Sequence, residues 1–253
     1  MRLLMLMGLL FWTEPAFAGR SQMTAEETYD LGQRYLKRGY YVKALEQFNR
    51  VRTYFRDDPF ALKAELAIAD MHYDKNEWDA ARVAYEDFVR AHPRYPELDY
   101  VVYRLGMTNY KKAPVIPDRD QAWTRAAVNT WSTFSARFPE SIYREEVETL
   151  LVKARKRLAR KELQIALFYL HRDAPLAVEG RVIGLLQKYP DSPDVPRALY
   201  MVGVAYAQTE RIELANAALD RMKSEFPEDR WTARLERDIK KYTAHAAGET
   251  PTP

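Results

Sequence analysis

Apolar residues recur at steps of three and four positions along most of the chain, which is the period of an amphipathic α-helix. One such stripe consists of Ala44, Leu45, Phe48 and Val51. A later stripe of the same kind consists of Trp231, Leu235, Ile239 and Tyr242. We find no segment with the strict apolar–polar alternation that is typical of half-buried strands. The pattern predicts an all-α protein.

A longer period is superimposed on the helical one. Five times, a small residue is followed by an aliphatic anchor, then an aromatic or aliphatic residue, then a proline. The anchors are Gly32/Ala44/Phe48/Pro59, Ala69/Ala81/Tyr85/Pro93, Gly106/Ala127/Trp131/Pro139, Ala166/Val178/Val182/Pro190 and Gly203/Ala215/Leu219/Pro227. The first interval is 12 residues in every set but the third, and the aliphatic anchor precedes the proline by 12 in every set but the first. This spacing is the skeleton of the tetratricopeptide (TPR) unit, a pair of antiparallel helices of about 34 residues.

The spacing therefore predicts a TPR solenoid, a right-handed superhelix of five helix-pair repeats followed by a C-terminal capping helix. A single pair cannot bury its apolar stripe alone, so neighbouring repeats must stack. We place the repeats at about 25–59, 60–93, 98–139, 141–190 and 194–227, and the capping helix at 228–242. The proline should close the second helix of each repeat, because it lacks the N–H that would continue it. Gly32 and Gly203 should face Ala44 and Ala215, where small side chains let two helices approach closely.

Two repeats depart from the regular spacing. Gly106 precedes Ala127 by 21 residues, and the additional residues fall in 111–125, where Pro114 and Pro117 forbid a continuous helix. We expect an extended loop there, between the two helices of the third repeat. Ala166 lies 27 residues after Pro139, which predicts a first helix of roughly 30 residues in the fourth repeat.

The N-terminal residues resemble a secretory signal peptide. Arg2 is followed by an apolar stretch over 3–12 and by small residues before Gly19. We therefore expect a signal peptide at 1–18, an exported chain, and a polar, disordered tail at 243–253. The apolar stretch is too short to span a bilayer.

Composition argues against several functions. The net charge of +3 is too small to favour nucleic-acid binding, and the sequence has no cysteine for thiol chemistry or metal ligation. The four histidines lie far apart, so no metal-ligand pair results. With no phosphate-binding loop and no paired acid and base, we expect no cofactor and no enzymatic activity. One basic run remains as a candidate site, either a solvated face or a ridge that meets an acidic protein surface or lipid headgroups: Lys153, Arg155, Lys156, Arg157, Arg160 and Lys161.

Residues 92–110, HPRYPELDYVVYRLGMTNY, resemble a signature of the BamD family, a helical-repeat component of the machinery that assembles β-barrels into the bacterial outer membrane. Further matching residues are 118–120, 125–127, Phe134, Phe138–Pro139, Ser141, Tyr143, Val178, 181–182, Leu186 and 189–191. The similarity spans about residues 25–230. It is specific, because generic TPR proteins share the anchors but not this string.

This resemblance implies a periplasmic scaffold at the inner face of the outer membrane. Such proteins dock on the POTRA domains of the BamA barrel subunit, and the position matching Arg181 lies at that interface. Their N-terminal repeats are thought to bind the C-terminal targeting signal of unfolded barrel substrates. The candidate groove residues are Tyr35, Tyr73, Tyr100 and Tyr103, although each tyrosine could instead pack within or between repeats.

Two points stay open from the sequence. Family members are usually anchored by a lipidated cysteine after the signal peptide, and this sequence has Gly19 there and no cysteine. We therefore expect peripheral membrane association through the partner, or a free periplasmic protein. The alternative function is a periplasmic TPR adaptor of the envelope-division machinery, similar to the coordinator proteins of the Tol–Pal system.

Overall fold

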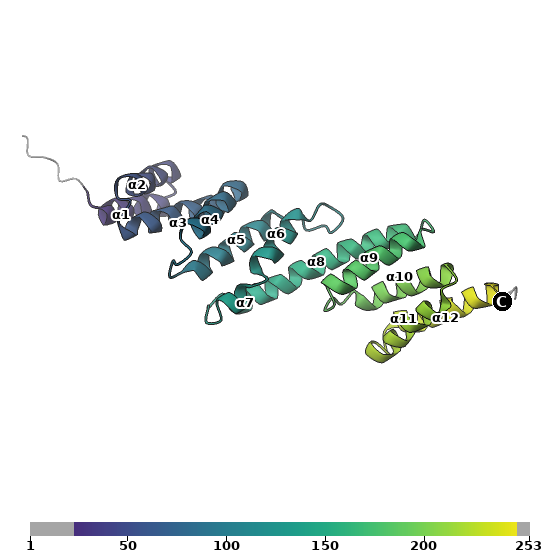
Figure 1. Ribbon diagram of the computed structural model, residues 1–253. Coiled ribbons are helices and arrows are strands. Elements are labelled where there is room, and N and C mark those ends of the chain that lie inside the picture. Colours follow the sequence, from purple (N-terminus) through teal and green to yellow (C-terminus); the bar gives the residue numbers. More distant parts are fainter. Residues whose placement is uncertain (1–22, 247–253) are drawn as a thin grey trace, which may run out of the picture. The chain divides into compact units, whose positions relative to one another are not determined.

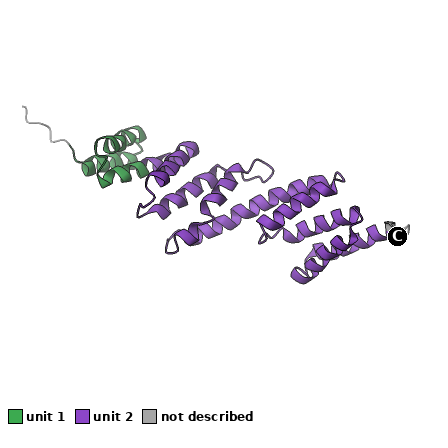
Figure 2. Ribbon diagram, viewed as in Figure 1, with its two compact units in different colours: residues 1–67 green, residues 68–253 purple. Residues whose placement is uncertain are grey.

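The computed structural model describes residues 23–246, and throughout this range the regular elements are α-helices (Figure 1). The expected signal peptide at 1–18 and residues 247–253 of the expected tail lie outside the described residues. The chain divides into two compact units, residues 1–67 and 68–253, with the boundary inside one helix (Figure 2).

The first unit contains α1 (Ala25–Lys37), α2 (Tyr41–Tyr54) and the start of α3 (Pro59–Asp74). Thr24 caps α1 because its Oγ1 accepts a hydrogen bond from the backbone N–H of Glu27, whose carboxylate accepts one from the Thr24 N–H. The ring of Phe48 lies directly against Gly32. The anchor spacing predicted Ala44 as the close neighbour of this glycine, but the nearest atoms belong to the Phe48 ring.

The second unit continues the pattern of paired helices. Its members are the end of α3, α4 (Trp78–Ala91), α5 (Leu98–Lys112), α6 (Ala122–Trp131), α7 (Phe134–Arg137), α8 (Arg144–Leu170), α9 (Pro175–Lys188), α10 (Val195–Gln208), α11 (Ile212–Glu225) and α12 (Arg230–Ala246). Helices that follow one another in the chain pack together, as α8, α9, α10 and α11 do in turn. This nearest-neighbour packing is typical of a TPR solenoid.

Four helix pairs are joined by the same tight turn. Its left-handed residue is Gly39, Asn76, Asp173 or Glu210, with φ between 51° and 76°. The third pair has no such turn, since the loop between α5 and α6 replaces it, as the two prolines predicted. The long helix expected in the fourth repeat is α8, with 27 residues.

The prolines close the second helix in four repeats but not in the first. Pro93, Pro139, Pro190 and Pro227 each follow an aromatic or histidine C-cap residue. In the first repeat, α2 has already ended at Tyr54, and Pro59 is the first residue of α3. A proline fits that position because the first N–H groups of a helix have no partner within it.

The C-terminal core lies between α8 and α12. Leu235 of α12 is fully buried, and its methyl groups lie against Gly203 of α10, so Leu235 rather than Ala215 is the close neighbour of this glycine. Helix α12 thereby covers the last repeat, as a capping helix should. It continues to Ala246, four residues past the expected end at 242, so the start of the expected disordered tail is helical.

In the third repeat, Trp131 fills the space beside Gly106. The indole is 1% exposed and lies so close that a Cβ on Gly106 would be 2.0 Å from its Nε1 atom. The second helix of this repeat is interrupted, with α6 ending at Trp131 and the short α7 beginning at Phe134.

Candidate functional site

Aromatic side chains from the first helices of three repeats meet in the second unit. Tyr73 comes from α3, Tyr100 and Tyr103 come from α5, and Tyr143 is the N-cap residue of α8. The tyrosine cluster, as we call it, is completed by charged side chains and one tyrosine of α4. Its members are Asp70, Tyr73, Asp74, Tyr85, Tyr100, Tyr103, Arg104, Tyr143 and Glu146.

Asp70 forms the base of the cluster. Its Oδ1 accepts hydrogen bonds from the hydroxyl groups of Tyr85, at 2.5 Å, and Tyr100, at 2.8 Å. Because these tyrosines lie on α4 and α5 and the aspartate on α3, one carboxylate joins three helices. Burial raises the pKa of Asp70, while the two hydroxyl donors and the nearby Arg104 oppose that rise. Burial and the charge of Asp70 in turn raise the pKa values of Tyr85 and Tyr100, so both hydroxyl groups stay protonated donors.

Arg104 crosses the cluster and is only 17% exposed. Its Nε donates to the Tyr85 hydroxyl at 3.2 Å, and its terminal nitrogen donates to Asp74 at 3.2 Å. The guanidinium lies 3.7 Å above the centre of the Tyr73 ring, a cation–π contact that fixes this ring in place. The arginine therefore holds both the buried and the half-exposed part of the cluster.

The outer part of the cluster is a stack of two rings. Tyr103 and Tyr143 lie nearly parallel, at 10°, with centroids 4.7 Å apart. The Tyr103 hydroxyl donates to Glu146 at 3.0 Å, and burial together with this carboxylate raises the pKa of Tyr103 to about 12. Both rings are half-exposed, so they offer a rigid aromatic surface to solvent.

Tyr35, the fourth predicted groove residue, belongs to the first unit. Its ring centre is 6.4 Å from that of Tyr40, and Lys43 lies over both rings at 5.7 Å and 5.5 Å. The structure thus brings together three of the four tyrosines, and it places Tyr35 beside the turn between α1 and α2.

The six residues of the basic run divide into three pairs. Arg155 and Arg160 form ion pairs with Asp191 and Asp194, each at 3.0 Å, in the segment before α10. Arg157 and Lys161 instead donate hydrogen bonds to the carbonyl oxygens of Pro114 and Arg119 in the loop after α5. Lys153 and Lys156 remain exposed. Four of the six cations thus hold neighbouring loops in place.

Arg181 lies on the exposed surface of α9. Its side chain is 46% exposed and donates to Glu162 of α8 at 3.2 Å. A guanidinium with one partner retains further donors for a carboxylate on another protein.

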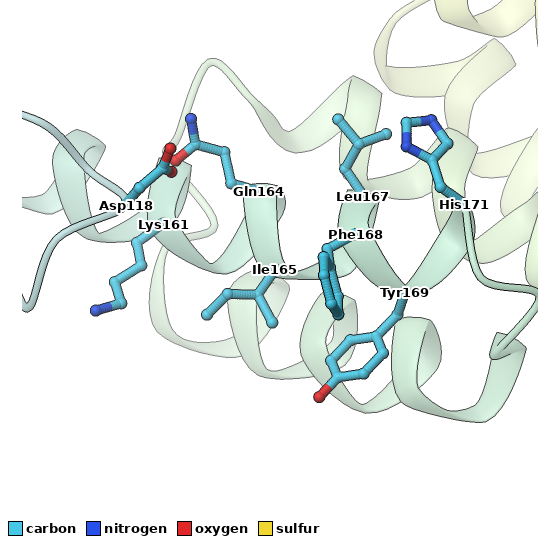
Figure 3. A pocket seen from close by; sticks show the side chains of 8 residues that line it. All are labelled: Asp118, Lys161, Gln164, Ile165, Leu167, Phe168, Tyr169 and His171. Atoms are coloured by element: carbon cyan, nitrogen blue, oxygen red, sulfur yellow. The ribbon is translucent and has the colours of Figure 1, made fainter.

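A surface hollow lies along the second half of α8, beside the loop after α5 (Figure 3). Ile165, Phe168 and Tyr169 supply its apolar lining, and Asp118 and Lys161 supply charge. The sequence did not mark this hollow, because its charged members come from a loop and a helix that are 43 positions apart.

Sequence reasoning also missed Asp70, Arg104 and Tyr143. Arg104 stands within the matching segment 92–110, and Tyr143, also a matching residue, lies four residues after Phe138–Pro139, but no spacing rule distinguishes a cluster residue from a solvated one there. Among the described residues, no group of three or more acidic or histidine side chains could hold a metal ion. In the same part of the chain, no helix combines the length and hydropathy that crossing a bilayer requires.

Paired helices, left-handed turns and a capping helix together define a TPR-type repeat protein with an aromatic surface on its first helices. Comparison with known proteins gives the family. A sequence model of the YfiO family, described as outer membrane lipoprotein, matches residues 21–222. The chain belongs to this family, and the resemblance to BamD proteins is confirmed.

Two BamD proteins agree with this assignment. The outer membrane protein assembly factor BamD of Pasteurella multocida is 31% identical over 203 residues, which cover 77% of this chain and 78% of that protein. The BamD of Xylella fastidiosa strain Temecula1 is 26% identical over 218 residues, covering 83% and 74% of the two chains. A solved complex of yeast Sti1, titled TPR2AB-domain:pHSP90-complex, is similar at a TM-score of 0.41 and 15% identity, over 88% of this chain and 86% of that one.

Proposed function

We propose that this protein is a periplasmic scaffold in the assembly of β-barrel proteins into the bacterial outer membrane. Its family and the names of its relatives support this role. In this proposal the tyrosine cluster binds the C-terminal segment of an unfolded barrel substrate, and the α9 surface around Arg181 binds POTRA domains of a BamA-like subunit.

The observation that carries the peptide-binding proposal is the stacked pair Tyr103 and Tyr143. Both rings are half-exposed, yet stacking already restricts both of them, and a hydrogen bond to Glu146 restricts Tyr103 further. A ligand that packs on restricted rings loses little additional entropy, because the side chains are ordered before it arrives. Peptides from barrel strands supply suitable side chains, since such strands carry aromatic girdles.

Peptide affinity tests this part of the proposal. A fluorescent peptide with the last residues of a barrel strand should bind the wild type, and Tyr103→Ala combined with Tyr143→Ala should weaken binding on the order of tenfold, as central aromatic contacts do. Tyr54, an exposed tyrosine of α2, is the matched control, and Tyr54→Ala should bind like the wild type. Equal affinity of the double variant, with its helicity intact, would remove the cluster from peptide binding.

The ion pair between Arg181 and Glu162 allows a sharp test of the POTRA contact. Arg181→Glu should weaken docking on purified POTRA domains, because it places a second carboxylate beside Glu162 and removes the cation. Glu162→Gln should preserve or strengthen docking, since it frees the guanidinium for the partner. If Glu162→Gln weakens docking as much as Arg181→Glu, docking depends on the internal ion pair and not on a direct contact between Arg181 and the POTRA domains. Circular dichroism should show unchanged helicity for both variants.

A further inference from the structure

The turn between α1 and α2 exposes consecutive apolar side chains that the proposed function does not use. Tyr40, Tyr41 and Val42 are 54%, 40% and 82% exposed. A single exposed apolar residue is ordinary, but three in succession at the outer end of a helix pair form a projecting apolar edge. Gly39 makes the turn possible with a φ of 76°, and no atom approaches the position of its missing Cβ.

Cations surround this edge, and the nearest acidic residues along the chain, Asp30 and Glu46, lie outside the turn. Residues 34–45 contain four cations and no aspartate or glutamate. The four are Arg34, Lys37, Arg38 and Lys43, and all are exposed. Among the described residues, none of the four takes part in an ion pair. The positive charge at this turn is therefore available to something outside the chain.

The other three tight turns show that this charge is not needed to make the turn. Glu77 forms an ion pair with Lys75 beside the left-handed Asn76. In the remaining two turns, the left-handed residues themselves are the acids Asp173 and Glu210. Each of these turns thus mixes both signs of charge, whereas the first carries only cations.

We propose that the first turn, residues 34–43, docks peripherally on an anionic lipid surface. Tyr40, Tyr41 and Val42 would enter the headgroup region, where tyrosine rings are favoured because one edge is apolar and the hydroxyl stays hydrated. The cations would then reach the phosphates, and the stems of the lysines and arginines would extend along the apolar edge.

A lipid surface fits this turn better than a protein partner does. A stable protein interface buries about 800 Å² on each side with matched shape, and a projecting edge of three side chains offers no such area. A bilayer needs no matched shape, since insertion depth adapts to the side chains. An inorganic anion would use the cations but would leave the apolar edge without a role.

Vesicle binding by the full-length protein tests the proposal. The sequence has no cysteine, so Val42→Cys provides a single labelling site for an environment-sensitive dye. Vesicles of phosphatidylethanolamine and phosphatidylglycerol should shift the emission of this dye to the blue, and phosphatidylcholine vesicles should not. Leu176→Cys, at the exposed start of α9, is the matched control, and a dye there should not respond.

Charge and apolar variants complete the test. Lys37→Gln combined with Arg38→Gln should lower vesicle affinity on the order of 30-fold, since each cation near an anionic surface contributes about fivefold. The exposed pair Lys153→Gln and Lys156→Gln should bind like the wild type. Tyr40→Ser with Val42→Ser should also lower affinity. An unresponsive Val42 dye, equal losses in the control pair, or complete competition by inorganic phosphate at constant ionic strength would each overturn the proposal. It would equally fail if the variants lost a protein partner while retaining vesicle binding.

Discussion

Substitution of glycine by alanine should have opposite effects at different helical positions of this chain. At Gly106, an added Cβ would lie 2.0 Å from Nε1 and 2.2 Å from Cε2 of Trp131, well inside contact distance. At Gly180 and Gly184 of α9, no atom lies within 4 Å of the added Cβ. The same chemical change therefore tests close helix packing at one site and helix propensity alone at the other two.

The size of the effect at Gly106 depends on how far the added methyl group must displace the Trp131 indole. Trp131 is 1% exposed, so its indole can be displaced only by disturbing the core between α5 and α6. Overpacking of a core costs about 1–3 kcal/mol, and complete loss of a buried aromatic costs about 3–5 kcal/mol. The alanine regains about 1 kcal/mol of helix propensity. We expect Gly106→Ala to lower the free energy of unfolding by about 2–3 kcal/mol, and Gly180→Ala and Gly184→Ala to raise it by about 0.5–1 kcal/mol each.

Urea unfolding followed by circular dichroism would measure these changes, with thermal melts as a second reading. Gly106→Ala combined with Trp131→Phe should recover part of the loss, because the smaller ring leaves room for the methyl group. This recovery would appear as a coupling energy between the two positions. A Gly106→Ala protein as stable as the wild type, or a double variant whose losses simply add, would refute the close contact between α5 and α6.

Other consequences of the structure can be measured in the same way. Glu210→Gly should raise the free energy of unfolding by about 0.5–1 kcal/mol, since Glu210 has a φ of 58° and glycine adopts that conformation without strain. Gly39→Ala should lower the free energy of unfolding, because Gly39 has a φ of 76°. A change of the same sign in both variants would contradict this reasoning. Burial raises the pKa of Asp70 above its ordinary value of 3.8, so the folded state binds this proton more tightly than the unfolded state, and the contribution of Asp70 to stability falls as the pH rises from 3.8 through the raised pKa. Relative to Asp70→Asn, the wild type should therefore lose stability over that interval in urea titrations at a series of pH values, and a difference that grows with pH would show the opposite shift.

The helices and their pairing could be predicted from the sequence because the governing signals are local. The apolar period and the recurring anchors mark the helix pairs, and Pro114 with Pro117 marks the loop in the third repeat. The prediction that Pro59 closes a helix was wrong, since it begins α3. Proline can follow the end of one helix or occupy the first turn of the next, and the anchor spacing does not distinguish these positions. Four added residues of α12 were assigned to a tail because their polar composition fits either state.

The candidate site was only partly predictable, because its contacts join distant parts of the sequence. The tyrosines stood out by type, but Asp70 and Arg104 are 34 positions apart and no motif connects them. The basic run was ambiguous for the same reason. Its partners Asp191 and Asp194 lie more than 30 residues further along the chain, so the helix pattern alone could not show that Arg155 and Arg160 were already paired.

The central claim is that this chain is a scaffold for barrel assembly, and the most direct measurement is its set of partners in native membranes. The full-length protein, captured from detergent-solubilised envelopes and analysed by mass spectrometry, should bring down a barrel protein with POTRA domains, and Arg181→Glu should reduce that recovery. Enrichment of peptidoglycan synthases without any such barrel protein, at equal capture of the scaffold itself, would contradict the claim and favour a role in envelope division.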